Sequence, residues 1–182
     1  MTTRRRDARC RRPRDAKRQR GATLLEALGY LTVAAVITTG VLALFGPSFS
    51  NAKAQSLASE VTSFANDIRD LYASQNSYSN VSIGTLVQAH AVPPTLKVNG
   101  SGASATLSNT WGGAVTLNPE SQQVQLQYSN VPSDVCRRVL VSGGDWAGIE
   151  VNNESVQNPP NLAQAYAACN NAAGNTISWA FQ

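Results

Sequence analysis

A long apolar segment near the start of the chain limits what this sequence can fold into. Residues 22–45 read ATLLEALGYLTVAAVITTGVLALF and carry a single charge, on Glu26. A helix rises about 1.5 Å per residue, so this segment would extend over about 36 Å and cross the roughly 30 Å apolar core of a bilayer. The alternative is a buried core helix of a soluble protein. The length of the segment favours a membrane-spanning helix.

The charges on either side give that helix a direction. Residues 1–21 contain ten Lys/Arg and two Asp, a net charge of +8, whereas residues 22–182 contain five Lys/Arg and nine Asp/Glu, a net charge of −4. Positively charged flanks of membrane helices stay in the cytoplasm. We therefore expect a cytoplasmic N-terminus and an exported body.

Three other interpretations of the N-terminal region fit less well. A nucleic-acid-binding arm would explain the arginines, but the segment lacks aromatic residues and adjoins a membrane span, so we expect no nucleic-acid partner. A twin-arginine export signal would need apolar residues directly after the arginines. A secretory signal cut after Ala52-Lys53-Ala54 would have a far longer apolar region than the usual span of about 7–15 residues. The segment is therefore predicted to be an anchor.

Helical periodicity continues beyond the apolar segment. Apolar side chains recur at spacings of four, three, four and three residues, at Leu57, Val61, Phe64, Ile68 and Leu71. This spacing predicts one apolar stripe along a helix. Pro47 either bends this helix or begins its second half. We expect one helix over residues 22–75, apolar all round in residues 22–45 and amphipathic afterwards.

The rest of the chain, residues 76–182, is predicted to form a globular head. Alternating and periodic apolar residues predict three strands and two helices: strands at 113–117, 123–128 and 177–181, and helices at Ser133–Val141 and Leu162–Cys169. The first two strands would pair through a turn at 118–121, and Ser133 and Asp134 can cap the first helix. The predicted fold class is α+β, with the long helix packed on an antiparallel sheet.

The junction of the basic and apolar segments carries the most specific motif. In RQRGATLLEALGYL, a basic stretch ends at Gly21, an apolar run begins at Ala22, and Glu26 is its fifth residue. This pattern resembles the signature of type IV pilins. It departs from that signature at Ala22, where Phe or Met is more common, and in lacking a proline near residue 43. The leader length and the segment NTWGGAV make the chain similar to the type IVb subclass.

The resemblance implies a function and its partners. A prepilin peptidase would cut between Gly21 and Ala22 and methylate Ala22, removing the leader 1–21. The chain would be a structural subunit, held by one helix in the inner membrane of a Gram-negative bacterium. With inner-membrane assembly machinery it would polymerise into an extracellular helical filament for adhesion or conjugation. The alternatives are a minor pilin, a secretion pseudopilin, or a monomeric binding protein anchored in the inner membrane.

Glu26 is costly where it lies, since a carboxylate deep in a spanning helix costs about 2.5–3.5 kcal/mol on insertion scales. Near a helix end its side chain can also simply reach the headgroups. The resemblance favours a role in assembly: after cleavage, Glu26 of one subunit would neutralise the free amine of Ala22 on a neighbour. Such a pair would set the axial register of packed helices.

Cys136 and Cys169 would lie in an oxidising compartment if the body is exported, so a disulfide is expected rather than two buried free thiols. Cys10 lies in the leader. By resemblance, the region between the paired cysteines carries subunit contacts. Trp146 in this region is either a core residue, which we favour, or a surface contact.

No motif of an enzyme is present. The chain has no GxSxG, no phosphate-binding glycine loop, no HExxH and no CxxC, and its single histidine, His90, has no candidate partner nearby. Asp145, Glu150 and Glu154 are spaced unlike any calcium loop, so we interpret them as solvated carboxylates. The sequence therefore predicts no catalytic residue, no metal site and no cofactor.

Overall fold

The computed structural model describes residues 23–75 and 77–182, with the backbone alone at 42–48. The chain divides into two units, Met1–Ala43 and Leu44–Gln182. The expected leader 1–21 and Ala22 lie outside the described residues.

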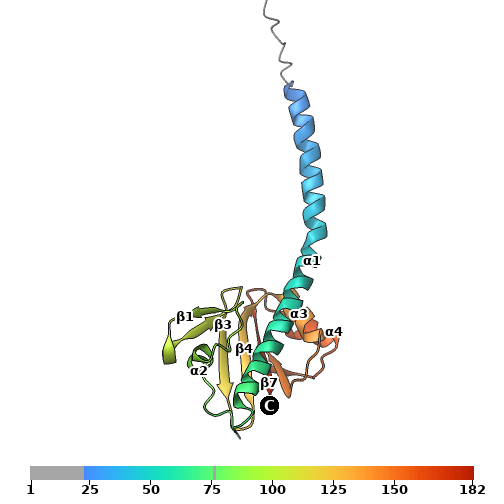
Figure 1. Ribbon diagram of the computed structural model, residues 1–182. Coiled ribbons are helices and arrows are strands. Elements are labelled where there is room, and N and C mark those ends of the chain that lie inside the picture. Colours follow the sequence, from blue (N-terminus) through green and yellow to red (C-terminus); the bar gives the residue numbers. More distant parts are fainter. Residues whose placement is uncertain (1–22, 76) are drawn as a thin grey trace, which may run out of the picture. The chain divides into compact units, whose positions relative to one another are not determined.

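One long helix, α1 (Leu24–Tyr72), begins in the first unit and continues into the second (Figure 1). The prediction of a single helix is confirmed, with an end three residues earlier than expected. The predicted apolar stripe is buried at four of its five positions, Leu57, Val61, Phe64 and Ile68. These side chains are the contribution of α1 to the core.

The fifth position of the stripe was predicted wrongly. Leu71 is 40% exposed, and Tyr72 is 6% exposed and takes its place in the core. The stripe continues from Ile68 by four residues instead of three, which turns Leu71 outward. Burial of Tyr72 is tolerated because its hydroxyl donates to the Asn80 carbonyl oxygen at 3.3 Å.

The second unit contains a seven-stranded antiparallel sheet in the order β1-β2-β3-β4-β7-β5-β6. The strands are β1 (Lys97–Asn99), β2 (Thr106–Ser108), β3 (Ala114–Pro119), β4 (Val124–Val131), β5 (Gly148–Val151), β6 (Glu154–Val156) and β7 (Asn175–Phe181). The three predicted strands correspond to β3, β4 and β7, and the β3–β4 hairpin pairs as expected, with Pro119 opposite Val124. The four short strands were not predicted.

Three α-helices accompany the sheet: α2 (Ile83–Gln88), α3 (Ser133–Val141) and α4 (Leu162–Ala168), with a 3₁₀ turn at Gly102–Ser104. The predictions of α3 and α4 are confirmed. The predicted cap of α3 is wrong, because Pro132 occupies the N-cap position and the Ser133 hydroxyl donates instead to the Asn171 carbonyl oxygen at 3.0 Å. Sequence analysis missed α2.

The core lies where α1 crosses the sheet beside β4 and β7 (Figure 1), and its largest side chains are aromatic. Tyr128 and Trp179 meet edge to face with ring centroids 5.8 Å apart. Trp146 is half-buried, with ring centroids 6.3 Å from Trp179 and 6.4 Å from Phe181. Trp146 therefore packs against the core, as predicted.

A disulfide closes the C-terminal part of the head. Cys136 in α3 is bonded to Cys169 directly after α4, across a sequence separation of 33, and both residues are fully buried. The disulfide predicted from the sequence is confirmed. It links α3 covalently to the end of α4.

Replacing both cysteines, as Cys136→Ala with Cys169→Ala, should destabilise the head by about 3.5–4 kcal/mol, the loop-closure entropy regained by the unfolded chain. Urea unfolding of the uncleaved full chain in detergent measures this difference. Cys10→Ser is the matched control and should leave the unfolding midpoint unchanged. Two thiols open to alkylation in unfolded, unreduced protein would contradict the disulfide itself.

Tyr128 should make the head sensitive to alkali. Burial, together with the nearby Glu60 carboxylate, raises the pKa of Tyr128 above its usual value. The unfolded chain then ionises before the folded one, so stability is full below about pH 10 and falls as pH rises above it. Tyr128→Phe should remove this part of the pH dependence, measured by urea unfolding at pH 7 and pH 11.

The same substitution tests the burial of the hydroxyl, which has no hydrogen-bond partner among the described residues. Tyr128→Phe should leave stability at pH 7 unchanged or raise it by up to about 1 kcal/mol. Tyr72→Phe is the control, because it removes a hydroxyl that is hydrogen-bonded, and should cost about 1 kcal/mol. A loss at Tyr128 as large as at Tyr72 would show that its hydroxyl is paired.

Candidate functional site

The first half of α1 exposes a continuous apolar surface. Leu24–Val41 is long and apolar enough to cross a membrane, by length and composition, and none of it is buried within the structure. Leu24, Leu25 and Tyr30 are among its most exposed side chains. An apolar surface of this size needs a cover of lipid or of other apolar side chains.

Three threonine hydroxyls of this segment are hydrogen-bonded within the helix. The hydroxyls of Thr32, Thr38 and Thr39 donate to carbonyl oxygens one turn earlier, at 2.8, 2.7 and 3.0 Å. A hydroxyl bonded in this way does not require water. The threonines therefore leave the surface compatible with an apolar environment.

Glu26 lies in the first turn of α1 and is exposed. Its backbone N–H donates to the Thr23 hydroxyl at 3.4 Å, the arrangement of an N-cap residue three positions before an acid. The positive end of the helix dipole also favours a carboxylate here. The Thr-x-x-Glu spacing is a signal that our sequence reasoning missed. Gly21 and Ala22 lie outside the described residues.

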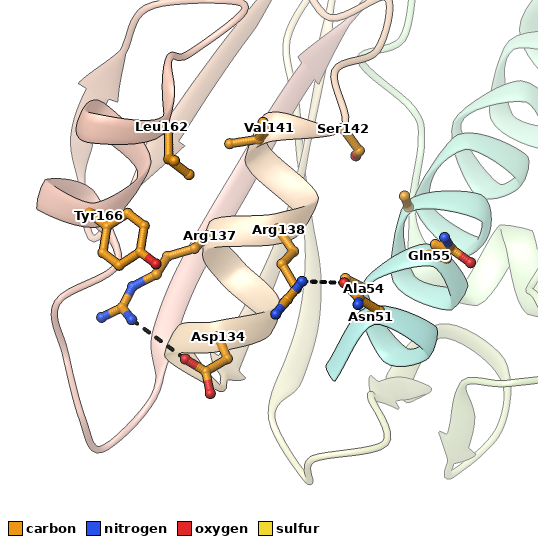
Figure 2. Close-up of a pocket in the computed structure, with 11 residues that line it drawn as sticks. Asn51, Ala54, Gln55, Asp134, Arg137, Arg138, Val141, Ser142, Leu162 and Tyr166 are labelled. Atoms are coloured by element: carbon orange, nitrogen blue, oxygen red, sulfur yellow. Dashed lines mark hydrogen bonds and ion pairs between the residues drawn. The ribbon is translucent and has the colours of Figure 1, made fainter. Parts of the chain in front are cut away.

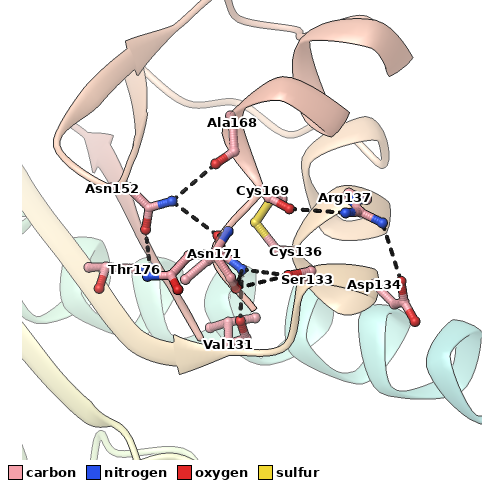
Figure 3. The surroundings of a disulfide bond; sticks show 11 residues. Val131, Ser133, Asp134, Cys136, Arg137, Asn152, Ala168, Cys169, Asn171 and Thr176 are labelled. Carbon is pink, nitrogen blue, oxygen red and sulfur yellow. Dashed lines mark hydrogen bonds and ion pairs between the residues drawn. A yellow bond between two sulfur atoms is a disulfide. The ribbon is translucent and has the colours of Figure 1, made fainter. Parts of the chain in front are cut away.

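A buried asparagine, Asn175 at the start of β7, organises the surroundings of the disulfide. Figure 3 labels the residues that its amide joins, which are Val131, Ser133, Asn152 and Asn171. Asn175 Nδ2 lies 3.3 Å from the Val131 carbonyl oxygen and 3.1 Å from both the Ser133 hydroxyl and the Asn171 carbonyl oxygen. Its Oδ1 accepts from Asn152 Nδ2 at 3.0 Å and from the Asn171 N–H at 3.2 Å. One amide thus joins the end of β4, the start of α3 and two loops.

Arg137 fastens α3 to α4. Its guanidinium lies 4.6 Å from the centre of the Tyr166 ring and donates to the Cys169 carbonyl oxygen at 3.3 Å. It also forms an ion pair with Asp134 at 3.5 Å. A guanidinium stacked on an aromatic face gains a cation–π attraction in addition to these hydrogen bonds.

A groove of about 600 Å³ lies between α1, α3 and α4 (Figure 2). Its walls are Asn51, Ala54, Gln55 and Ala58 from α1; Asp134, Arg137, Arg138 and Val141 from α3, with Ser142 after it; and Leu162 and Tyr166 from α4. Arg138 donates to the Asn51 side-chain oxygen across the groove. Two arginines and the exposed apolar side chains of Val141, Leu162 and Tyr166 thus line one groove.

The other residues considered in the sequence analysis, three acidic residues and His90, lie on separate elements. Asp145 precedes β5, while Glu150 in β5 accepts from Gln125 Nε2 at 3.0 Å and Glu154 lies in β6. Among the described residues, no group of three His, Cys, Asp or Glu side chains is placed to hold a metal ion. His90 follows α2 with a φ of 55°.

Comparison with known proteins identifies relatives among pilins. Residues 51–182 match the family described as PilS N terminal. The major structural subunits of the bundle-forming pilus from Escherichia coli O127:H6 and O111:H- are each 29% identical over 112 residues, covering 62% of this chain. The chain spans 56% of the length of these relatives.

Two solved structures share the fold. The type IVb pilin from Salmonella typhi matches with a TM-score of 0.58 and 22% identity, covering 67% of this chain and 95% of that one. TcpA, a type IV pilin from Vibrio cholerae El Tor biotype, matches with a TM-score of 0.50 and 13% identity, covering 73% and 99%. Since the family match also covers most of the sequence, the chain belongs to the PilS N-terminal family and has the fold of a type IVb pilin.

Proposed function

We propose that this protein is the precursor of a structural subunit of a type IVb pilus. The observation that carries the proposal is the exposed apolar half of α1, with its lone Glu26, on a head of the pilin fold. Before assembly lipid would cover this surface, and in the filament the same surface would pack against the helices of other subunits. The relatives named as major structural subunits of a pilus support this function.

Processing would precede assembly. A prepilin peptidase on the cytoplasmic face would cut between Gly21 and Ala22 and methylate the new N-terminus. The competing site after Ala54 is disfavoured, because Ala54 is only 5% exposed within a continuous helix. A cut there would remove the part of α1 that begins the core.

Glu26 would then guide assembly. Its carboxylate is exposed on the first turn of α1. In the sequence it follows Ala22, on which cleavage would create a free amine, by four residues. Pairing with the Ala22 amine of a neighbour would compensate both charges in the apolar filament core. Adjacent subunits would thereby be held at one axial offset.

The partners follow from this pathway. The subunit would sit in the inner membrane with its N-terminus in the cytoplasm, meet the peptidase and the assembly machinery there, and leave as an extracellular helical homopolymer. Its role would be structural rather than enzymatic, in adhesion or in conjugation.

The mature protein should begin at Ala22. Intact-mass measurement of the protein from cells that contain the peptidase should show loss of residues 1–21 and addition of one methyl group. Gly21→Ala is expected to leave the precursor uncut. A mature chain that begins at Gln55 would contradict the proposal.

Glu26→Ala should insert into the membrane and be cut normally, but should form at least tenfold less filament. Insertion is retained because the substitution removes a charge that is costly in lipid. Assembly fails because each joint would bury an unpaired amine. The measurement compares subunit in the membrane fraction with subunit in sheared filament.

Two variants separate the charge of Glu26 from its place in the helix cap. Thr23→Ala removes the cap and keeps the charge, so it should assemble. Glu26→Gln keeps the size and removes the charge, so it should not. Normal filaments from Glu26→Gln would show that the charge of Glu26 is not needed for assembly and that Glu26 is only a tolerated acid at a helix end. Absence of filaments from the wild type, with its machinery present, would favour the anchored monomer.

A further inference from the structure

Cationic side chains gather at the end of the head where α1 enters it, which we term the entry end. Residues 22–182 contain five Lys/Arg, and three of them, Lys53, Arg137 and Arg138, lie there. Arg138 donates to the Asn51 side-chain oxygen, so α3 lies beside this part of α1. Figure 1 shows α3 and α4 next to α1 at the entry end, with the C-terminus at the opposite end.

The acids of the entry end do not balance its cations. Asp134 forms an ion pair with Arg137 at 3.5 Å. Glu60, seven residues after Lys53, lines a depression of about 180 Å³ with it, but among the described residues no ion pair joins the two. Even with both acids counted, the entry end keeps a net charge of +1, whereas residues 22–182 as a whole carry −4.

The opposite end of the head is acidic. The Arg69 guanidinium donates to the carbonyl oxygens of Gln182 at 2.8 Å and Asp145 at 3.4 Å, and the Tyr78 N–H donates to the Ser121 carbonyl oxygen at 3.2 Å. The last turns of α1 therefore meet the C-terminus and the β3–β4 turn. Four acids lie here against one cation: Asp67, Asp70, Glu120 and Asp145. An anionic surface would attract the entry end and repel the opposite end.

The exposed aromatic side chains of the head lie at the entry end as well. Among the aromatic residues of 49–75 and 77–182, only Phe49 and Tyr166 are more than half exposed, at 62% and 55%. The Tyr166 ring lies 4.6 Å from the Arg137 guanidinium, and half-buried Trp111 lines the depression that contains Lys53. Aromatic rings beside cations are typical of surfaces at the level of lipid headgroups.

The sequence places the entry end at this level when residues 22–45 span a membrane. α1 is continuous, so Asn51, six residues after Phe45, lies about 9 Å further along its axis. The headgroup layer extends about 5–8 Å beyond the apolar core on each side. Lys53 and Arg138 are exposed, and their long side chains can extend toward that layer.

We propose that the entry end docks on the phosphate groups of anionic phospholipids while the subunit is in the membrane. The inference rests on the membrane stage of the proposed function. Guanidinium and ammonium groups bind phosphate through charge-assisted hydrogen bonds. Lys53 and Arg138 are best placed for this contact, because neither has an ion-pair partner among the described residues. Arg137 is partly engaged in holding α3 to α4.

The two cations would hold the head on different sides of α1. Lys53 lines a depression with Trp111, whereas Arg138 lines the groove between α1, α3 and α4 (Figure 2), and the two sets of lining residues are different. Contacts on two sides of one helix resist tilting of the head. Zwitterionic lipids would restrain the head less, because their own ammonium groups balance their phosphates.

Quenching of a fluorophore in lipid nanodiscs tests the docking with the full chain. The protein carries Cys10→Ser and one labelled cysteine, Ala167→Cys, which is exposed in α4 two residues before Cys169. The discs contain a nitroxide-headgroup lipid in either phosphatidylglycerol or phosphatidylcholine. Quenching should be at least twofold stronger in phosphatidylglycerol, and high salt should remove the difference. The label reports on the head, so lipid bound by the basic residues 1–21 does not affect it.

Substitutions of the two cations locate the contact. Lys53→Gln combined with Arg138→Gln should remove most of the difference between the lipids, because both unpaired charges are lost. Lys53→Arg combined with Arg138→Lys should keep it, because both charges remain. Lys97→Gln is the matched control, since Lys97 is an exposed cation on the edge strand β1, and should behave as the wild type.

A second label, on Ser121→Cys in the β3–β4 turn, should be quenched equally weakly in both lipids. Equal quenching of the Ala167→Cys label in the two lipids overturns the inference, as does an unchanged difference in the combined glutamine variant. An equal rise at both labels also overturns it, because the head would then approach the lipid without a preferred end. A wild-type chain that enters discs of neither lipid contradicts the proposed function instead.

Discussion

The packing of the apolar stripe of α1 on β4 and β7 is the contact on which the rest of the head depends. It places Phe64 and Ile68 in one buried cluster with Tyr128 and Trp179. Apolar side chains of α2 and α3 belong to the same cluster. A helix laid along a sheet in this way covers the middle of one face and leaves a flank on each side. On one flank α3 and α4 complete the layer, and on the other the segment around α2 does so (Figure 1).

The elements that sequence reasoning predicted are those with several periods of a regular pattern. Apolar residues alternate over six residues in β4 and five in β7, and α1 repeats its stripe over four turns, so local signals and tertiary packing agree. β1, β2, β5 and β6 have three or four residues each, too few to display a period. Their conformation depends on the neighbouring strand, which a local pattern does not contain.

The candidate site divides in the same way. The disulfide of Cys136 and Cys169 could be predicted because two cysteines in an exported body are expected to pair. Glu26 could be proposed for the site because a lone charge in an apolar run is visible in the sequence itself. The role of Asn175 was missed, since it stands among asparagines of a polar loop and only the fold buries it. The groove between α1, α3 and α4 was missed because its walls come from three helices that are separated in the sequence.

The apolar half of α1 cannot by itself fix how one pilin subunit is positioned against the next. The exposed side chains of Leu24–Val41 are nearly all apolar, and apolar packing tolerates sliding and rotation because it is not directional. Order in a filament must then come from the few directional groups beside that surface. Glu26 would provide one at the start of α1, and polar and charged side chains of the head would provide others. Together they would fix both the offset and the rotation of neighbouring subunits.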